Sequence, residues 1–117
     1  MADREFVKAV TITDTKTGEQ FILDFNREAV AFAENRGFKV EDLGNYPVTK
    51  VPEFFFYAFR AHHKNVARNK TDALLEAMGG MTTALIERLM ALYAQAGYIN
   101  IIADEDSEKN ATVTVEL

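Results

Sequence analysis

The sequence predicts an α+β fold: an N-terminal antiparallel β-hairpin packed on a mainly helical bundle of about four helices. Two short stretches near the N-terminus alternate between apolar and polar residues, whereas most of the remaining chain has helical periodicity interrupted by glycines. The chain has 117 residues, of which 48% are hydrophobic and 26% are charged. These values are typical of one globular domain with its own core, so we expect a single domain over residues 1–117.

The hairpin is predicted over residues 6–25, where two β-rich stretches flank a turn signal. One face of the first stretch carries Phe6, Val10 and Ile12 and is interrupted by Lys8. One face of the second stretch carries Phe21, Leu23 and Phe25. Residues 15–18 separate the two stretches, and Gly18 can take a positive φ. We therefore expect a loop of about four to five residues.

The first helix is predicted over residues 27–36. Asn26 is a good N-cap, and Gly37 is a natural left-handed stop. Phe25 and Val30 have the spacing of a hydrophobic staple across the N-terminus of this helix. Residues 38–49 are expected to form a connector with a helical turn at 40–43, because Gly44, Asn45 and Pro47 oppose a longer helix.

Three further helices are predicted in the second half of the chain. One begins near residues 49–52 and continues to about Lys64 or Val66. A short one over residues 72–78 is capped by Asn69 or Thr71 and ended by the Gly79–Gly80 pair. The longest covers residues 84–96, with an extension to residue 103 weakened by Gly97.

The C-terminal residues allow two interpretations. Residues 104–108 are an acidic loop, and residues 112–117 alternate Val113, Val115 and Leu117 with polar residues. This segment either adds a third strand beside the hairpin, which alone would be marginal in water, or is a frayed tail. We therefore treat residues 104–117 as a flexible or strand-forming tail.

The net charge of −5 hides an uneven distribution. Residues 50–70 carry five bases and one acid, whereas residues 104–117 carry one base and five acids. Either these residues form ordinary solvated surface, or they form complementary patches that pair within one chain or between copies. The acidic total makes free nucleic acid an unexpected partner.

The absence of cysteine and the polar N-terminal residues indicate an intracellular location. The chain has no cysteine, which excludes disulfides and thiolate metal sites and fits a reducing cytoplasm. Its first five residues are polar and do not resemble a signal peptide. The apolar run at residues 54–59 is too short to cross a bilayer about 30 Å thick. We expect a cytoplasmic protein without a membrane partner.

The residues that usually carry chemistry do not form a recognisable site. His62 and His63 are neighbours and point about 100° apart on a helix, so they cannot form an i, i+4 zinc pair. The acids of residues 104–108 lack the spacing and the glycine of a calcium loop, and Gly79–Gly80 lacks the flanking residues of a phosphate loop. We therefore predict no catalytic residue, no metal site and no cofactor.

The aromatic run at residues 54–59 is the least ordinary feature of the sequence. Core packing explains it if neighbouring elements cover the helix on both sides. Alternatively, part of the run stays exposed and anchors a partner helix, as aromatic and arginine side chains do at interfaces. On this second interpretation the predicted partner-binding residues are Phe54, Phe56, Tyr57, Arg60, Lys64 and Tyr93.

Several stretches, taken in order, resemble the small tail assembly chaperones of long-tailed phages and of prophages of Gram-positive bacteria. The resemblance extends over nearly the whole chain and contains no catalytic motif. The stretches are FILDFNREAV at 21–30, ENRGF at 34–38, FFFYAFRAHH at 54–63, the short helix before Gly79–Gly80, and LMALY at 89–93.

This resemblance implies a non-enzymatic role in the cytoplasm of a bacterial host. Such chaperones coat the long helical tape measure protein, keep it soluble, help recruit tail tube protein and leave before the virion is complete. Binding along a rod also implies contacts between copies, as in a homo-oligomer. Two other roles remain open: another phage assembly protein such as a head–tail connector or tail terminator, or a prophage-encoded protein that binds a host factor.

Overall fold

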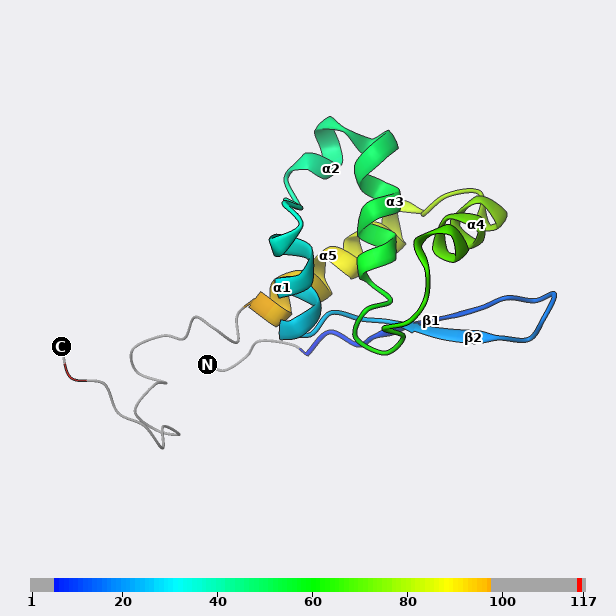
Figure 1. Cartoon of the computed structure of the whole chain (residues 1–117), viewed down its shortest axis with the longest axis horizontal. Helices are drawn as coiled ribbons and strands as arrows, with labels where there is room; N and C mark the ends of the chain where they lie inside the picture. The colour runs from blue at the N-terminus through cyan, green and yellow to red at the C-terminus, as the bar shows by residue number, and fades with distance from the viewer. Residues whose placement is uncertain (1–5, 98–115, 117) are drawn as a thin grey trace.

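A computed structural model of the chain describes residues 6–97 and Glu116, and it has an α+β architecture (Figure 1). A two-stranded antiparallel sheet precedes five helices, which confirms the predicted fold class. The elements are β1 (Val10–Thr13), β2 (Gln20–Leu23), α1 (Arg27–Asn35), α2 (Asp42–Asn45), α3 (Pro47–Tyr57), α4 (Arg68–Met78) and α5 (Thr83–Gly97). The predicted C-terminal strand and the extension of the last helix fall outside the described residues, apart from the exposed Glu116.

The hairpin has the alternation that the sequence predicts. Phe21 and Leu23 are buried, and Val10 and Ile12 are half-buried on the same side of the sheet. Phe6 does not join them, because 83% of its surface is exposed and it precedes β1. The connecting loop covers residues 14–19, slightly longer than predicted, and Gly18 has a φ of 79°.

Helix α1 begins and ends for the predicted reasons. The side chain of Asn26 accepts a hydrogen bond from the Ala29 N–H at 2.8 Å, which satisfies one of the free N–H groups of the first turn. Phe25 and Val30 are both buried, as a hydrophobic staple requires. Gly37 follows the helix with a φ of 83°.

Helix α3 begins earlier and ends much earlier than predicted. Pro47 occupies its first turn, where the missing N–H costs nothing. The helix stops at Tyr57 instead of continuing to Lys64 or Val66, because the following turns bond to the hairpin. The Ala58 carbonyl accepts a hydrogen bond from the Asp24 N–H at 2.9 Å. Residues 58–66 are therefore a loop that crosses β2.

The last two helices differ from the prediction mainly at their N-termini. Helix α4 begins at Arg68, four residues earlier than expected, and its N-cap is Ala67. Thr71, predicted as a cap, is instead buried within the helix, where its hydroxyl donates to the Arg68 carbonyl at 3.0 Å. Gly79 ends α4 in the left-handed conformation, and Thr82 accepts a hydrogen bond from the Leu85 N–H at the start of α5.

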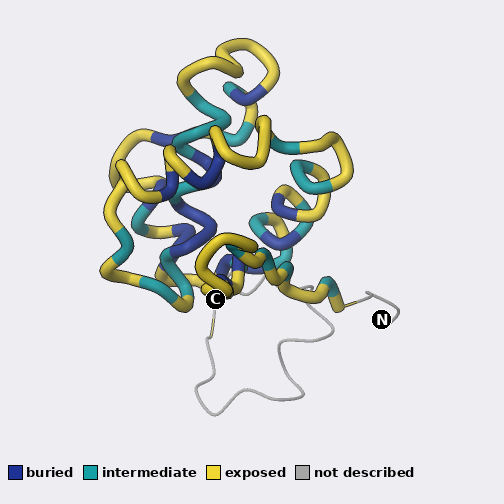
Figure 2. The backbone as a smooth tube through the Cα atoms, turned by 90° about the vertical axis from the view of Figure 1, so that its right-hand side faces the viewer, coloured by how far each residue is buried: buried dark blue, intermediate teal, exposed yellow. Residues whose placement is uncertain are grey.

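Helix α3 is central in the helical part of the molecule. It packs against α1, α2 and α4, and α1 also packs against α5. Buried backbone gathers inside this arrangement, while the outer turns are exposed (Figure 2). Within residues 6–97 no helix combines the length and the apolarity needed to span a membrane.

Candidate partner-binding surface

The aromatic run is divided between the core and the surface. Phe54 and Tyr57 are only 0% and 2% exposed, so two of the six predicted partner-binding residues cannot touch a partner in this fold. Phe56 and Arg60 are half-buried, and Lys64 is exposed. The expectation of surface anchors is therefore wrong for Phe54 and Tyr57, because α1, α2 and α4 cover α3 on several sides.

Phe54 lies at the centre of an aromatic cluster. Its ring stacks between Phe25 and Phe38, with centroids 5.3 Å and 5.4 Å away, and the edge of Tyr93 lies 5.9 Å from it. Tyr93 comes from α5 and completes this cluster on one side. The cluster therefore ties α1, α3 and α5 together, and Tyr93 belongs to it and does not lie with Phe56.

Tyr93 also borders an open pocket of about 370 Å³ between the end of α1 and the start of α2. Burial, together with the carboxylates of Glu34 and Glu41, raises the pKa of its phenol. A neutral phenol between two carboxylates is a hydrogen-bond donor. This pocket is thus distinct in chemistry and position from the basic surface around Arg60.

Tyr57 is held in the core by a polar contact with its own helix. Its hydroxyl donates a hydrogen bond to Glu53, one turn earlier, and Glu53 also pairs with Lys50 at 3.2 Å. Burial and the neighbouring Glu53 raise the pKa of Tyr57 to about 12. The contact satisfies the one polar atom of a buried ring, so Tyr57 is a structural residue.

The remaining predicted residues lie together with an aromatic residue of α1 that the sequence did not single out. Phe32 is half-buried, and its ring centroid lies 6.5 Å from that of Phe56. The Arg60 guanidinium lies 4.1 Å from the Phe32 centroid, a cation–π distance. We call Phe32, Phe56, Arg60 and Lys64 the aromatic–basic patch; these residues line one shallow depression.

Only part of the signal for Phe32 is present in the sequence. Phe32 is three residues after Ala29 and next to Ala33, both fully buried, so it lies at the edge of the buried face of α1. An aromatic residue at such an edge is often partly exposed. Its contact with residues 56 and 60 depends on how α1 packs on α3, which periodicity does not reveal.

The basic stretch at residues 50–70 is largely neutralised within the chain. Arg60 pairs with Glu28 at 3.0 Å, Lys70 with Glu19 at 3.3 Å and Arg68 with Asp72 at 2.9 Å. Lys50 pairs with Glu53 as described above. Of the five bases of this stretch, Lys64 alone makes no ion pair within residues 6–97. Pairing within residues 6–97 therefore accounts for four of the five bases of this stretch.

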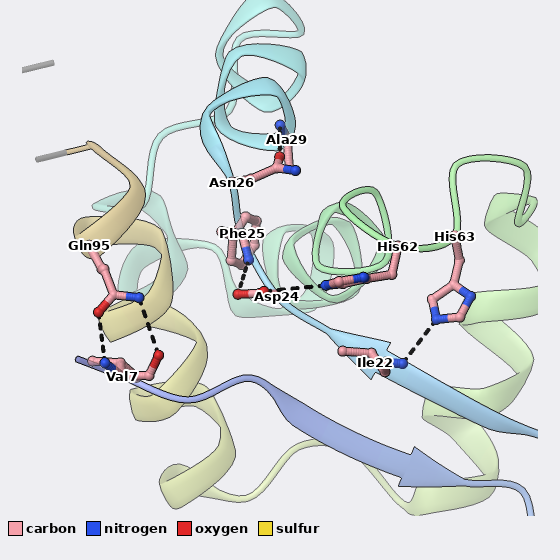
Figure 3. Close-up of polar contacts among 9 residues, drawn as sticks. All are labelled: Val7, Ile22, Asp24, Phe25, Asn26, Ala29, His62, His63 and Gln95. Atoms are coloured by element: carbon pink, nitrogen blue, oxygen red, sulfur yellow. Dashed lines mark hydrogen bonds and ion pairs between the residues drawn. The ribbon is translucent and has the colours of Figure 1, made fainter. Parts of the chain in front are cut away.

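The two neighbouring histidines fix the loop after α3 to β2 (Figure 3). His63 Nε2 accepts a hydrogen bond from the Ile22 N–H at 2.9 Å. His62 Nε2 lies 3.3 Å from an Asp24 carboxylate oxygen. Both side chains thus contact successive outward-facing positions of the hairpin. These contacts give the histidines a structural role that the sequence could not show.

The comparisons with known proteins identify one family. A family described as a domain of unknown function (DUF5055) matches residues 1–117. No curated protein and no solved structure gives a match to the chain. Because the family match spans the whole sequence, the chain belongs to the DUF5055 family.

Proposed function

We propose that this protein is a non-enzymatic tail assembly chaperone of a long-tailed phage or prophage. In this role it binds the helical tape measure protein in the host cytoplasm, keeps it soluble during tail assembly and is absent from the mature virion. The proposal is supported by the resemblance of residues 21–30, 54–63 and 89–93 to such chaperones. Tail tube protein and further copies of the chain are the other expected partners.

The aromatic–basic patch is the observation that carries this proposal. It combines two half-buried phenyl rings with an arginine and an exposed lysine. An amphipathic helix presents apolar residues at i, i+3, i+4 and i+7, and such helices dock on apolar surfaces. Aromatic and arginine side chains contribute most of the affinity at interfaces of this kind. We infer that the patch receives a client helix with apolar residues and carboxylates on the same face.

Arg60 is suited to such a contact although it already has an acidic partner. Its pair with Glu28 is close to solvent, since the Glu28 side chain is 46% exposed. Exposed ion pairs contribute about 0–1 kcal/mol, so exchanging Glu28 for a client carboxylate costs little. The stacking on Phe32 meanwhile holds the guanidinium in place and lowers the conformational entropy lost on binding.

The test is co-purification with the tape measure protein of the same phage or prophage. We expect the double variant Phe56→Ser/Lys64→Glu to lose the client, because it removes one ring and reverses one charge of the patch. The matched control is Val48→Ser/Lys16→Glu, which also replaces one apolar residue by serine and reverses one lysine charge, but at exposed sites elsewhere: Val48 is 86% exposed at the other end of α3, and Lys16 is in the hairpin loop.

Circular dichroism must show that both variants remain helical. Client binding that survives in Phe56→Ser/Lys64→Glu would remove the patch from the proposal. Recovery of the wild-type chain in purified virions would favour a connector or terminator. Capture of a host protein in place of the tape measure protein would favour a prophage protein directed at the host.

A further inference from the structure

The outer edge of β2 is occupied by the loop after α3. In an antiparallel pair, successive residues direct their backbone groups alternately toward the partner strand and away from it. The N–H groups of Ile22 and Asp24 point away from β1, and they donate to His63 Nε2 and to the Ala58 carbonyl, both at 2.9 Å. Figure 3 shows the first of these contacts. A further strand therefore cannot add to this side of the hairpin.

The outer edge of β1 is open. Thr11 lies opposite Ile22 and Thr13 opposite Gln20, so the backbone groups of both threonines point away from β2. Neither their N–H groups nor their carbonyls have a hydrogen-bond partner among residues 6–97 and Glu116. Open edges of this kind accept additional strands. The hairpin thus has one occupied edge and one available edge.

At the N-terminal end of this edge, the side-chain amide of Gln95 bonds to the backbone of Val7 as a neighbouring strand would. The Val7 N–H donates to Gln95 Oε1 at 2.7 Å, and Gln95 Nε2 donates to the Val7 carbonyl at 3.2 Å (Figure 3). This pair of bonds resembles one rung of a β-ladder. It also places the last turn of α5 beside the N-terminal end of β1, so the chain leaves α5 next to the open edge.

A groove lies beside this edge, between β1 and α4. Ile12 lines it from the strand, and Leu74, Ala77 and Met78 line it from the helix. The charged residues at its rim are of both signs, Asp14, Lys16 and Lys70, and Lys70 is paired with Glu19. Its volume is about 630 Å³. A strand added to β1 would direct every second side chain to the side of Ile12, toward this groove. The groove therefore favours a strand that alternates apolar residues with polar ones.

We propose that residues 112–117 of the same chain add to β1 as a third strand. Val113, Val115 and Leu117 alternate with Thr112, Thr114 and Glu116, as the groove requires. Residues 98–111 can span up to about 46 Å at ~3.3 Å per residue, whereas the edge from Val7 to Thr13 measures roughly 20 Å.

The proposal is independent of any client, and cysteine pairs test it in the full chain, which has no cysteine of its own. Thr11→Cys is combined in turn with Thr112→Cys, Thr114→Cys or Glu116→Cys, all on the face opposite Ile12. Cysteines form disulfides when their Cα atoms are ~4.4–6.8 Å apart. We expect one of these pairs to form an intramolecular disulfide at least about tenfold faster than its matched control.

The control replaces Thr11→Cys by Ile22→Cys. Ile22 faces Thr11 directly and is 39% exposed, but it would lie about 10 Å from a third strand. Equal rates with both partners, or no intramolecular disulfide at all, would overturn the proposal. A disulfide between two chains would assign the edge to a second copy and would also overturn it.

Amide hydrogen exchange provides a second measurement without cysteines. In the wild-type chain the Thr11 or Thr13 amide should exchange at least about tenfold more slowly than in Val113→Asp/Val115→Asp, which removes the apolar face of the added strand. The Ile22 amide, bonded to His63, serves as the internal reference. Identical exchange of Thr11 and Thr13 in both proteins would contradict the proposal.

Discussion

Phe54 and Phe56 are two residues apart and chemically identical, yet the structure gives them opposite roles. Phe54 is fully buried and contacts three aromatic rings, whereas Phe56 is half-buried at the surface patch. Replacing each by alanine therefore separates a core contribution from a surface contribution. We expect Phe54→Ala to be strongly destabilising and Phe56→Ala to be mild.

The expected magnitude follows from burial. Truncating a buried phenylalanine costs about 3–5 kcal/mol in lost transfer free energy and cavity formation. Aromatic pairs add about 0.5–1.5 kcal/mol beyond area burial, which places Phe54→Ala in the upper part of that range. Phe56→Ala removes a side chain that is already partly hydrated, so we expect about 1–2 kcal/mol. Since domains of this size are stable by only about 5–15 kcal/mol, the first change is severe.

Urea unfolding followed by far-ultraviolet circular dichroism measures both values. Thermal unfolding gives a second readout. At roughly 4 °C per kcal/mol for a chain of this length, Phe54→Ala should lower Tm by about 16–20 °C and Phe56→Ala by about 4–8 °C. The urea m-value should stay unchanged if both variants keep the same fold. A cost below about 1.5 kcal/mol for Phe54→Ala, or an equal cost for both, would refute the assignment of Phe54 to the core.

Two further predictions concern single polar contacts. Asn26→Ala should lower the free energy of unfolding by about 1 kcal/mol, because the Ala29 N–H loses its cap. Asn26→Asp should retain most of the wild-type stability, because aspartate is also a good N-cap. Equal urea midpoints for the wild type and both variants would contradict this. The pKa of Tyr57 is raised from an ordinary 10.0 to about 12 in the folded chain. Between pH 10 and pH 12 the folded chain therefore keeps the phenol proton, whereas the unfolded chain loses it. The free energy of unfolding should therefore fall by roughly 2–3 kcal/mol as pH rises from about 10 to 12, and Tyr57→Phe should flatten that fall in urea titrations; parallel pH profiles would show that Tyr57 is not the cause.

Local signals in the sequence predicted the parts of the fold that depend on local interactions. The alternation around Phe21 and Leu23 predicted β2, and Asn26 predicted the start of α1, because strand periodicity and capping involve residues close in sequence. Gly79 ended α4 as expected, since its left-handed conformation is a property of one residue.

Long-range contacts explain what the sequence did not predict. The spacing of apolar residues predicted that the aromatic helix continues beyond Tyr57. The loop that follows Tyr57 is instead bonded to β2, and the hydrogen bond from Ile22 to His63 joins residues 41 positions apart. Thr71 looked like a cap because threonine often is one, although it lies inside α4. Tertiary contacts outweighed local propensity at both places.

The candidate partner-binding surface likewise depends on contacts that are distant in sequence. Phe56, Arg60 and Lys64 lie close together as predicted, but not on successive turns of one helix, because α3 ends at Tyr57 and the loop that follows it carries Arg60 and Lys64. The sequence could not separate Phe54 and Tyr57 from them, since burial depends on the elements that cover α3. It also missed Phe32, which reaches the patch only through the packing of α1 on α3.

The proposed function depends on one interaction, that between this chain and the tape measure protein. The most direct measurement is the solubility of that protein when expressed with and without this chain, followed by size-exclusion chromatography of the soluble fraction. We predict that the tape measure protein is soluble only in the presence of this chain and that the two elute together. Solubility that does not depend on this chain, with separate elution of the two proteins, would contradict the proposed function.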